Sequence, residues 1–495
     1  MKKKSLLAII ISLLLLNFSF GQDYGDFPII TPEQALNDLE ILHQGLDKFH
    51  SGMYWYTPKD SVDNAFKEVK KKINKDLSIP EYYKLIAPLV ALSREGHTNI
   101  SLPENIKKTI IDKASFLPIT IVFLKEQLYC ILDGSNLENI VLEGKEIESI
   151  NGEKPIEIAK KLAGFLTADG YIKTSKFTDL SNFSLSLYYF YYYGNVKNFT
   201  LKFKEIEKPI LIDSLQLAEI RKNVKNKQAI KERKAKKDLL EFKIITSETA
   251  YLGVHSFSNP DIKEGSKEKN IENFLVNSFE SIATNKIKNI IIDVSENSGG
   301  TEGNESLLYS YLGENYQKYK TVRAKTQNAI LDNGVDKPIE LKTFGFLERT
   351  FVNKKMKDGS FERREWIGYG LKAFKKKPKN AFSGKVYVII SPLTYSGGSE
   401  FSNMVYTNDL ATFVGEETGG GYYGNTSGYT QELILPNSKI EVNIPALQFV
   451  MNVAPKLPFG RGVIPHHEII PTFEQYVNEE NPSLDFILKS IEKDK

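Results

Sequence analysis

Hydrophobic residues in the first fifth of the chain recur at the spacing of an amphipathic helix. The first such segment follows Thr31-Pro32, a pair typical of a helix start. Its apolar face carries a leucine at every third or fourth position: Leu36, Leu39, Leu42 and Leu46. The stretches 61–73 and 79–92 repeat this spacing. Residues 31–96 are therefore predicted to form a small helical domain.

After residue 119 the pattern changes to short apolar runs of strand length. Such runs occur at 119–124 and 128–132, and a third one at 147–150 leads into a tight Asn151-Gly152 turn. A β-rich module is expected here.

Two later segments differ from this pattern in composition. Phe183–Tyr193 is rich in tyrosine and phenylalanine and is predicted to be buried or to lie between domains. Lysines dominate 221–237, where large apolar residues are few, so this stretch is expected to be a solvated linker or helix.

The rest of the chain alternates β-branched runs with helical patterns. The predicted strands are Ala250–Val254, Ile287–Val294, Val386–Ile390 and Thr412–Val414. The predicted helices are Ile271–Ile282, Glu305–Leu312, Glu400–Leu410 and Leu484–Lys493. This alternation indicates an α/β fold.

The amino terminus has the three regions of a secretory leader. Lysines at positions 2–4 precede an apolar run from Leu6 to Leu16, and Gly21 provides a small residue for cleavage. The apolar run is shorter than the roughly 20 residues that a membrane-spanning helix needs. The mature chain is therefore expected to be exported to the periplasm or the cell exterior, without a membrane span.

Composition and charge exclude several classes of function. The 495 residues are 41% hydrophobic and 26% charged, which is typical of globular proteins. The formal net charge of +3 falls to zero when the leader's lysines are removed, whereas proteins that bind nucleic acid normally carry a basic surplus. A single cysteine, Cys130, excludes an intramolecular disulfide and a Cys-rich zinc site. No nucleic acid, metal ion or cofactor is expected.

The best local signal for chemistry is a strand that leads through a turn of small residues into a helix. Val386–Ile390 precedes Thr394-Tyr395-Ser396-Gly397. Ser396 then lies at a helix N-terminus, where unpaired backbone N–H groups and the helix dipole favour negative charge. The N–H of Gly397 is a candidate oxyanion donor. Serine is also a common N-cap, so this segment alone leaves a nucleophile and a cap as alternatives.

A second predicted strand ends in a similar way. Residues 290–293 lead into Asn297 and the pair Gly299-Gly300, which fits a second oxyanion donor or an ordinary turn. A serine nucleophile also needs a base. His97 is the candidate, because it lies in the loop that follows the helical domain; a structural role in that loop is the alternative.

In this order, the segments resemble the tail-specific, or carboxyl-terminal processing, peptidases and the related tricorn-core serine proteases of clan SK. The motifs that carry the resemblance are Gly96-His97-Thr98, the Ile-x-x-Ile-Asn-Gly segment Ile147 to Gly152, Asp293 with Asn297, Gly299 and Gly300, Thr394-x-Ser396, Gly415-Glu416-Glu417-Thr418, and Gly462-Val463-Ile464-Pro465. Each motif is short, but six in the family's order are specific, and they span most of the mature chain.

The resemblance implies a crotonase/ClpP-like β/α superhelix as the protease core. It also implies the following organisation: a signal peptide over 1–21, a helical domain over 22–115, a PDZ-like module over 116–210, a charged linker over 211–243, a serine peptidase core over 244–475 and a C-terminal helix over 476–495. In that core Ser396 takes the place of the nucleophile, and Gly397 and Gly299 take those of the oxyanion donors. The matching supporting positions are Asn297, Gly300, Thr394 and Ser399, and those for peptide binding in the PDZ-like module are Ile147, Ile150, Asn151 and Gly152.

Departures from the motifs favour one branch of the family. The processing peptidases pair the serine with a lysine, at a position that is Gly421 here. The tricorn-like branch uses the histidine of the Gly-His-Thr region as general base, which assigns this role to His97. In that branch a serine precedes the histidine and a distal glutamate completes the set. Here Gly96 precedes His97, and no glutamate matches just before Gly462.

The first functional hypothesis is an exported serine endopeptidase that cleaves proteins or peptides, guided by their C-terminal tails. The missing lysine and glutamate, and the family's Asp-x-Arg arginine, which is Ser295 here, motivate a second hypothesis, a catalytically inactive peptide-binding protein of the same fold. A third, a hydrolase of small esters or amides, would share Ser396 but ignore long peptides. Protein or peptide substrates are thus the expected partners.

Overall fold

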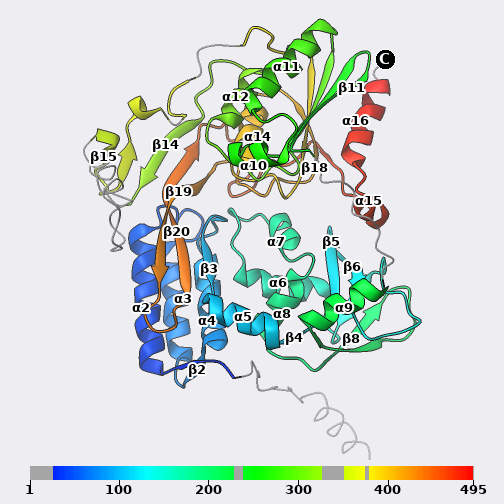
Figure 1. Ribbon diagram of the computed structural model, residues 1–495. Coiled ribbons are helices and arrows are strands. Elements are labelled where there is room, and N and C mark those ends of the chain that lie inside the picture. The colour runs from blue at the N-terminus through cyan, green and yellow to red at the C-terminus, as the bar shows by residue number, and fades with distance from the viewer. Residues whose placement is uncertain (1–25, 228–237, 326–350, 369, 374–377, 494–495) are drawn as a thin grey trace, which may run out of the picture.

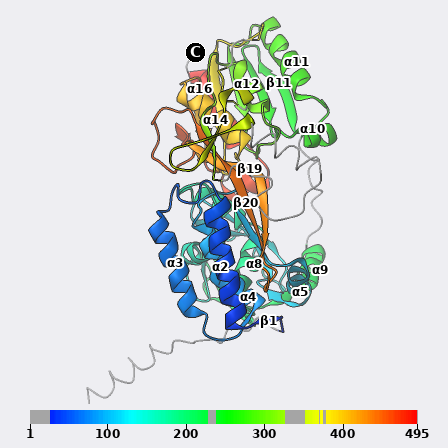
Figure 2. The same ribbon diagram turned by 90° about the vertical axis from the view of Figure 1, so that its left-hand side faces the viewer.

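The computed structural model describes residues 26–227, 238–325, 351–368, 370–373 and 378–493. The predicted signal peptide, 1–21, lies outside these residues. None of the helices in the described ranges is long and apolar enough to cross a lipid bilayer. The chain forms two halves, with residues 26–227 in the lower half of Figure 1 and most of the later residues in the upper half, an arrangement that Figure 2 shows from the side.

The lower half begins with helices. These are α2 (Pro32–Phe49), α3 (Lys59–Lys72), α4 (Ile79–Ala91) and α5 (Glu104–Lys113), with a short strand pair, β1 (Ile29–Ile30) and β2 (Leu77–Ser78), beneath them. Thr31 and Ser78 cap α2 and α4 in reciprocal capping boxes. The leucines at 39, 42 and 46 on α2 are buried. The predicted helical segment is confirmed, because its apolar stripes face one shared core.

A mixed module follows the helices. Its strands are β4 (Ser115–Phe116), β5 (Ile119–Leu124), β6 (Gln127–Asp133), β7 (Ile147–Ile150), β8 (Asn198–Phe203) and β9 (Ile210–Asp213), and its helices are α6 (Pro155–Leu162), η1 (Ala163–Phe165), α7 (Thr174–Asp179) and α8 (Ser184–Tyr193). The predicted Asn151-Gly152 turn is confirmed, and both residues have positive φ. Ile147 and Ile150 are buried in the core of the module, so their side chains are not available to a peptide.

Two predictions about composition can be compared with the structure of this module. The aromatic segment 183–193 is helix α8, and its residues are shared between the cores of the helical region and of the module, as predicted. For the lysine-rich stretch 221–237, predicted to be a linker or a helix, the described residues 221–227 are helical. The charged linker expected over 211–243 from the resemblance contains strands and this helix in its described part. Strand β10 (Leu215–Gln216) pairs with β4, and helix α9 (Leu217–Lys227) buries Leu217 and Ile220, one turn apart beneath a lysine-rich surface.

The upper half is built on a six-stranded sheet. Its order is β11 (Leu240–Thr246), β12 (Thr249–Val254), β13 (Asn289–Asp293), β17 (Lys385–Ile390), β18 (Thr412–Gly415) and β21 (His467–Glu468), parallel except for β11. Helices α10 (Asn259–Gly265), α11 (Ile271–Thr284), α12 (Asn304–Ser310), α14 (Gly397–Thr407), α15 (Phe473–Val477) and α16 (Pro482–Lys493) complete this half. The predicted α/β class is confirmed, since parallel strands that are buried along nearly their whole length alternate with helices.

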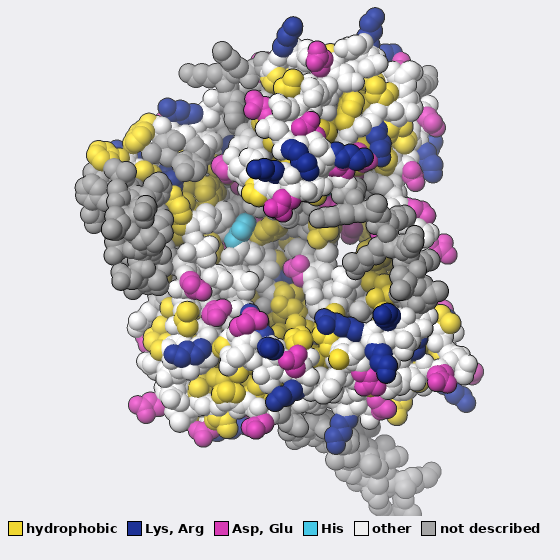
Figure 3. Space-filling view, viewed as in Figure 1, with side chains coloured by type: hydrophobic (Ala, Val, Ile, Leu, Met, Phe, Trp, Pro, Cys, Tyr) yellow, Lys and Arg dark blue, Asp and Glu magenta, His cyan; other side chains and the backbone are white. Residues whose placement is uncertain are grey.

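A second sheet connects the two halves. Its order is β15 (Asn353–Lys355), β16 (Phe361–Arg363), β14 (Tyr319–Ala324), β20 (Glu441–Met451) and β19 (Gly424–Ile434), with a 3₁₀ turn, η3 (Glu365–Ile367), after β16. The long β19–β20 hairpin descends beside α2 (Figures 1 and 2). Strand β3 (Asn99–Ser101) of the lower half pairs with β20. This pairing anchors the loop that carries His97 to the sheet that connects the halves. The molecular surface is hollowed between the two halves (Figure 3).

Candidate active site

The two predicted turns lie side by side because their strands are neighbours. Strands β13 and β17 are parallel, with Asp293 opposite Ile389, so both end at the same edge of the sheet. Beyond that edge, the backbone N–H of Tyr395 donates to the carbonyl of Asn297 at 2.9 Å. In open α/β sheets, ligands bind at the carboxyl ends of such strands.

Ser396 does not act as a helix cap. It precedes α14, yet its side chain makes no capping hydrogen bond, and its φ is +47°. This left-handed conformation is uncommon for residues other than glycine and concentrates at functional sites. Of the two interpretations that the sequence leaves open, the cap is therefore wrong: the turn presents the Ser396 hydroxyl to a cavity of about 340 Å³.

The cavity also contains candidate oxyanion donors, but not quite the predicted pair. The N–H of Gly299 donates to the Asn297 side chain at 2.9 Å and is already paired. Within the described chain, no acceptor meets the N–H groups of Gly397 and Gly300, and both residues line the cavity. Gly299 instead lets the two turns pack closely, because a Cβ at this position would lie 2.7 Å from the Cβ of Ser396.

The remaining predicted positions hold this turn in place. The Asn297 amide donates to the carbonyl of Val254 at 2.9 Å. The hydroxyl of Thr394 donates to the carbonyl of Val294 at 2.9 Å, and the hydroxyl of Ser399 donates to the carbonyl of Thr394 at 2.8 Å. All three side chains are buried, so they stabilise the backbone around Ser396 and do not face a substrate.

His97 lines the same cavity as Ser396 and Gly397. Its ring packs against the ring of Tyr395, with centroids 5.1 Å apart. Burial lowers the pKa of His97 below the ordinary value for histidine, and the charges of Asp169 and Glu400 offset this only in part. The ring is therefore neutral at neutral pH, as a general base must be. Its Nδ1 is buried and has no hydrogen-bond partner among the described residues.

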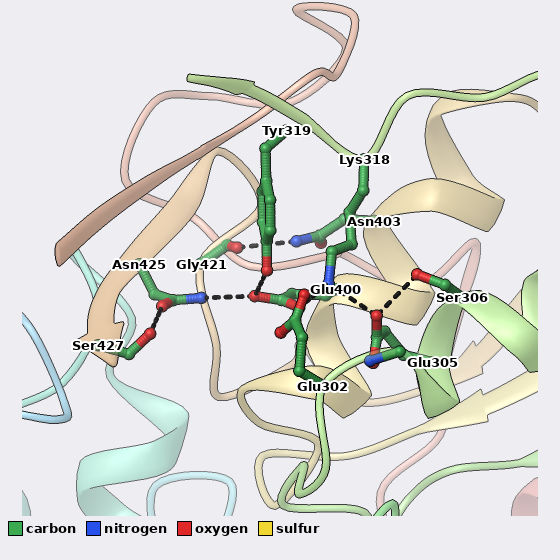
Figure 4. A network of polar contacts seen from close by, with 11 residues as sticks. Glu302, Glu305, Ser306, Lys318, Tyr319, Glu400, Asn403, Gly421, Asn425 and Ser427 are labelled. Carbon is green, nitrogen blue, oxygen red and sulfur yellow. Dashed lines mark hydrogen bonds and ion pairs between the residues drawn. The ribbon is translucent and has the colours of Figure 1, made fainter. Parts of the chain in front are cut away.

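An ionic network, which the sequence did not indicate, forms one wall of the cavity (Figure 4), and its groups are buried except for the exposed Glu302. The ammonium of Lys318 contacts Glu302, Glu305 and Glu400 at 2.5, 2.7 and 3.1 Å. Tyr319 donates to the other oxygen of Glu400 at 2.7 Å. Burial disfavours the charge of Glu400, but Lys318 and this hydrogen bond outweigh it, so the pKa of Glu400 lies below its usual value.

The three carboxylates of this network lie close enough together to hold a metal ion. The Lys318 ammonium, however, contacts one oxygen of each carboxylate and supplies the positive charge there. The cluster could not be predicted from the order of the elements along the chain. Lys318 belongs to the segment before β14 and comes close to α12 and α14 only when the chain is folded.

Replacing Lys318 by methionine is expected to destabilise the protein. The variant Lys318→Met keeps the volume of the side chain but leaves buried carboxylates without a counter-charge, which costs roughly 3–5 kcal/mol in other proteins. Urea unfolding followed by circular dichroism measures this change. Adding Glu305→Gln should restore part of the loss. Lys204→Met, which removes an exposed pair with Glu146, is the control and should change the midpoint little. An unchanged midpoint for Lys318→Met would contradict the expectation.

The two C-terminal motifs contact each other through an ion pair. The guanidinium of Arg461 binds both carboxylate oxygens of Glu417, at 2.7 and 2.6 Å, and the N–H of Gly462 donates to the same carboxylate at 2.9 Å. The hydroxyl of Thr418 accepts from the N–H of Val463 at 2.8 Å. These motifs therefore brace the turn before β19, and none of these residues lines the cavity with Ser396.

Comparison with known proteins agrees with this geometry. The model of peptidase family S41 matches residues 248–468. The solved structure of mature CPAF complexed with lactacystin is similar over 93% of this chain and 98% of its own, with a TM-score of 0.61 and 15% sequence identity. Mature CPAF itself aligns over 90% of this chain and 94% of its own, with a TM-score of 0.59 and 15% identity. At this identity the similarity concerns the fold. No curated protein matches the sequence.

Proposed function

Because residues 248–468 match the model of peptidase family S41, this chain is a serine-type peptidase of that family, and we propose that it is an exported endopeptidase with Ser396 as nucleophile and His97 as general base. The observation that carries this proposal is the conformation of Ser396. A serine at a helix N-terminus with φ of +47° and no capping bond faces a cavity that also contains a neutral histidine. Export rests on the leader-like residues 1–21.

The proposed reaction proceeds by acyl transfer. His97 removes the proton of the Ser396 hydroxyl as its oxygen attacks the peptide carbonyl, and the N–H groups of Gly397 and Gly300 stabilise the resulting oxyanion. The protonated His97 then gives its proton to the leaving amine, which breaks the peptide bond. Water, activated by His97 in the same way, releases the acyl group from Ser396 and regenerates both residues.

We propose further that C-terminal tails guide the substrate. The family resemblance suggests that the module of residues 116–210 binds such a tail as an added strand. Because Ile147 and Ile150 are buried, this binding would use backbone groups and not their side chains. The Asn151-Gly152 turn is itself engaged within the module, since the Asn151 side chain accepts the N–H of Thr200 at 2.8 Å.

One structural observation favours the inactive alternative. The Nδ1 of His97 meets no acid among the described residues, whereas removing such a partner from a Ser-His-Asp triad costs about 10⁴ in rate. A binding protein without turnover would retain tail recognition in the wild type and in Ser396→Ala alike.

The preference for tails is tested with the chain from Gln22 onwards and pairs of identical peptides that end in a free carboxylate or in an amide. Mass spectrometry identifies the products, and Ser396→Ala is the control. Cleavage of the free-ended peptides should be faster, because only they offer a carboxylate for capture. Equal cleavage of both would reject guidance by tails but retain the peptidase. Binding without cleavage by the wild type would favour the inactive alternative.

A further inference from the structure

Asp169 lies at the point where three segments around the candidate site meet. It belongs to the loop between η1 and α7, in the lower half of the molecule, and its side chain is almost fully buried. One carboxylate oxygen accepts the N–H of Gly96 and the hydroxyl of Tyr395, both at 2.8 Å. The other accepts the N–H of Gly421 at 3.0 Å. Three donors around one buried group fit an ionised carboxylate.

The three residues that donate hydrogen bonds to Asp169 lie beside candidate catalytic positions. Gly96 immediately precedes His97, and Tyr395 immediately precedes Ser396. Gly421 stands where the lysine of a Ser–Lys dyad would be expected. The carboxylate of Asp169 thus joins the segment of the base to the segment of the nucleophile, although 226 positions separate it from Tyr395 in sequence.

Tyr395 completes the connection between these two segments. Its ring packs on the ring of His97, with centroids 5.1 Å apart and planes 36° apart. A Cβ on residue 96 would lie 2.0 Å from the Tyr395 hydroxyl oxygen, so only glycine fits there. The Tyr395 hydroxyl therefore occupies the space where a larger residue before His97 would place its side chain.

We propose that Asp169 is the positioning residue for His97 in this chain. It acts through the backbone of Gly96 and the ring of Tyr395, in place of an acid bonded to the Nδ1 of His97. This inference rests on the proposed peptidase function. Two observations support it. The Nδ1 of His97 has no hydrogen-bond partner among the described residues. Gly96, which precedes His97, and Tyr395, whose ring packs on His97, both donate to the carboxylate of Asp169.

The charged groups around His97 determine how the loss of the Asp169 charge changes the pKa of His97. Glu95 lies two residues before His97, and burial raises the pKa of Glu95 well above its usual value, which disfavours a negative charge there. Burial also raises the pKa of Tyr395, which stays neutral. Glu400 faces His97 from α14, and Lys318 neutralises part of its charge. Neutralising Asp169 therefore removes a charge that favours protonated His97.

The test is the variant Asp169→Asn in the full mature chain, assayed on an unstructured protein substrate. Its kcat should fall about 10²-fold, since small misplacements of catalytic groups have effects of this size, while KM changes little. The acid limb of its pH–rate profile should also move to lower pH, because His97 loses a favourable charge. Tyr395→Phe keeps the ring and the Asp169 charge but loses one hydrogen bond. It should lower kcat by a smaller factor and leave the acid limb in place.

Asp38→Asn is the matched control. Asp38 is fully buried and likewise joins distant segments, since it accepts the N–H groups of Asn437 and Ser438 at 3.0 and 2.7 Å, away from the cavity. It should lower stability without changing kcat or the pH profile of the folded enzyme. If Asp169→Asn behaves like Asp38→Asn, the inference is wrong. If Asp169→Asn does not fold, an unchanged kcat in Tyr395→Phe overturns it. If wild-type cleavage does not depend on Ser396 and His97, the proposed function itself fails.

Discussion

The variant Ser396→Ala is expected to lose essentially all peptidase activity, with kcat lower by about 10⁴- to 10⁶-fold. The hydroxyl oxygen is the only atom removed, and it is the atom that forms the acyl bond in the proposed mechanism. Binding should survive, because the N–H groups of Gly397 and Gly300 and the walls of the cavity remain. Cleavage of an unstructured protein and binding of a peptide, measured on the same preparation, separate these two effects.

Ser402→Ala provides the matched control for this experiment. Ser402 lies on the same helix, α14, and is buried, with its hydroxyl bonded to the carbonyl of Gly398 at 2.9 Å. Removing that hydroxyl tests whether helix α14 tolerates the loss of a buried serine hydroxyl that does not line the cavity. Full activity in Ser396→Ala would disprove the assignment of the nucleophile. A comparable loss in Ser402→Ala would show that the effect of Ser396→Ala arises from a damaged helix.

The sequence predicted the strands that carry this site more successfully than those that complete the cavity. Strands β12, β13, β17 and β18 are buried on both faces and show in the sequence as short runs of mainly apolar residues. The β19–β20 hairpin was not predicted. Strand β19 begins with the polar run Gly424-Asn425-Thr426-Ser427. The first three of these residues are buried, and Glu400 and Glu95 accept hydrogen bonds from Asn425 and Thr426.

The same contrast holds within the site. Ser396 and His97 could be predicted because each lies in a short local motif, and motifs have a recognisable order. Asp169 and Lys318 lie in no motif. The groups that donate to Asp169 lie 73 or more positions away in sequence, and Lys318 binds Glu400, 82 positions away, as well as the nearer Glu302 and Glu305. A single sequence does not encode such pairings in any local pattern. The error at Gly299 has a related cause, since the Asn297 side chain that accepts its N–H turns back only in the folded loop.

Both halves of the molecule are needed to assemble the candidate site. The proposed nucleophile, Ser396, and the candidate oxyanion donors follow strands of the upper half, whereas His97 and Asp169 come from the lower half. Strand β3 holds the two together by pairing with β20 directly after the His97 loop. We therefore expect that the upper half alone, even if folded, lacks the proposed base and the residue proposed to position it.

The second large effect is expected for His97→Ala, with kcat lower by about 10⁴-fold, because the Ser396 hydroxyl then loses its proposed base. The carboxylates that line the cavity, Glu302, Glu305 and Glu400, are already engaged by Lys318. His43→Gln is the matched control. His43 is a partly buried histidine on α2 that bonds to Asp63 at 3.0 Å, and α2 does not border the cavity. This control should keep its activity. Equal activity in His97→Ala and wild type would assign the proton transfer to another group.

The pH dependence of the wild type tests the same assignment independently. Only neutral His97 can accept the serine proton, so the rate should fall as pH falls through the pKa of His97. Burial lowers that pKa, and the nearby charges of Asp169 and Glu400 offset the effect only in part. The acid limb of kcat/KM should therefore lie below the usual histidine range, around 6.5 in peptides. A limb well above that range would indicate a base other than a buried histidine, because an exposed or acid-paired imidazole holds its proton to higher pH.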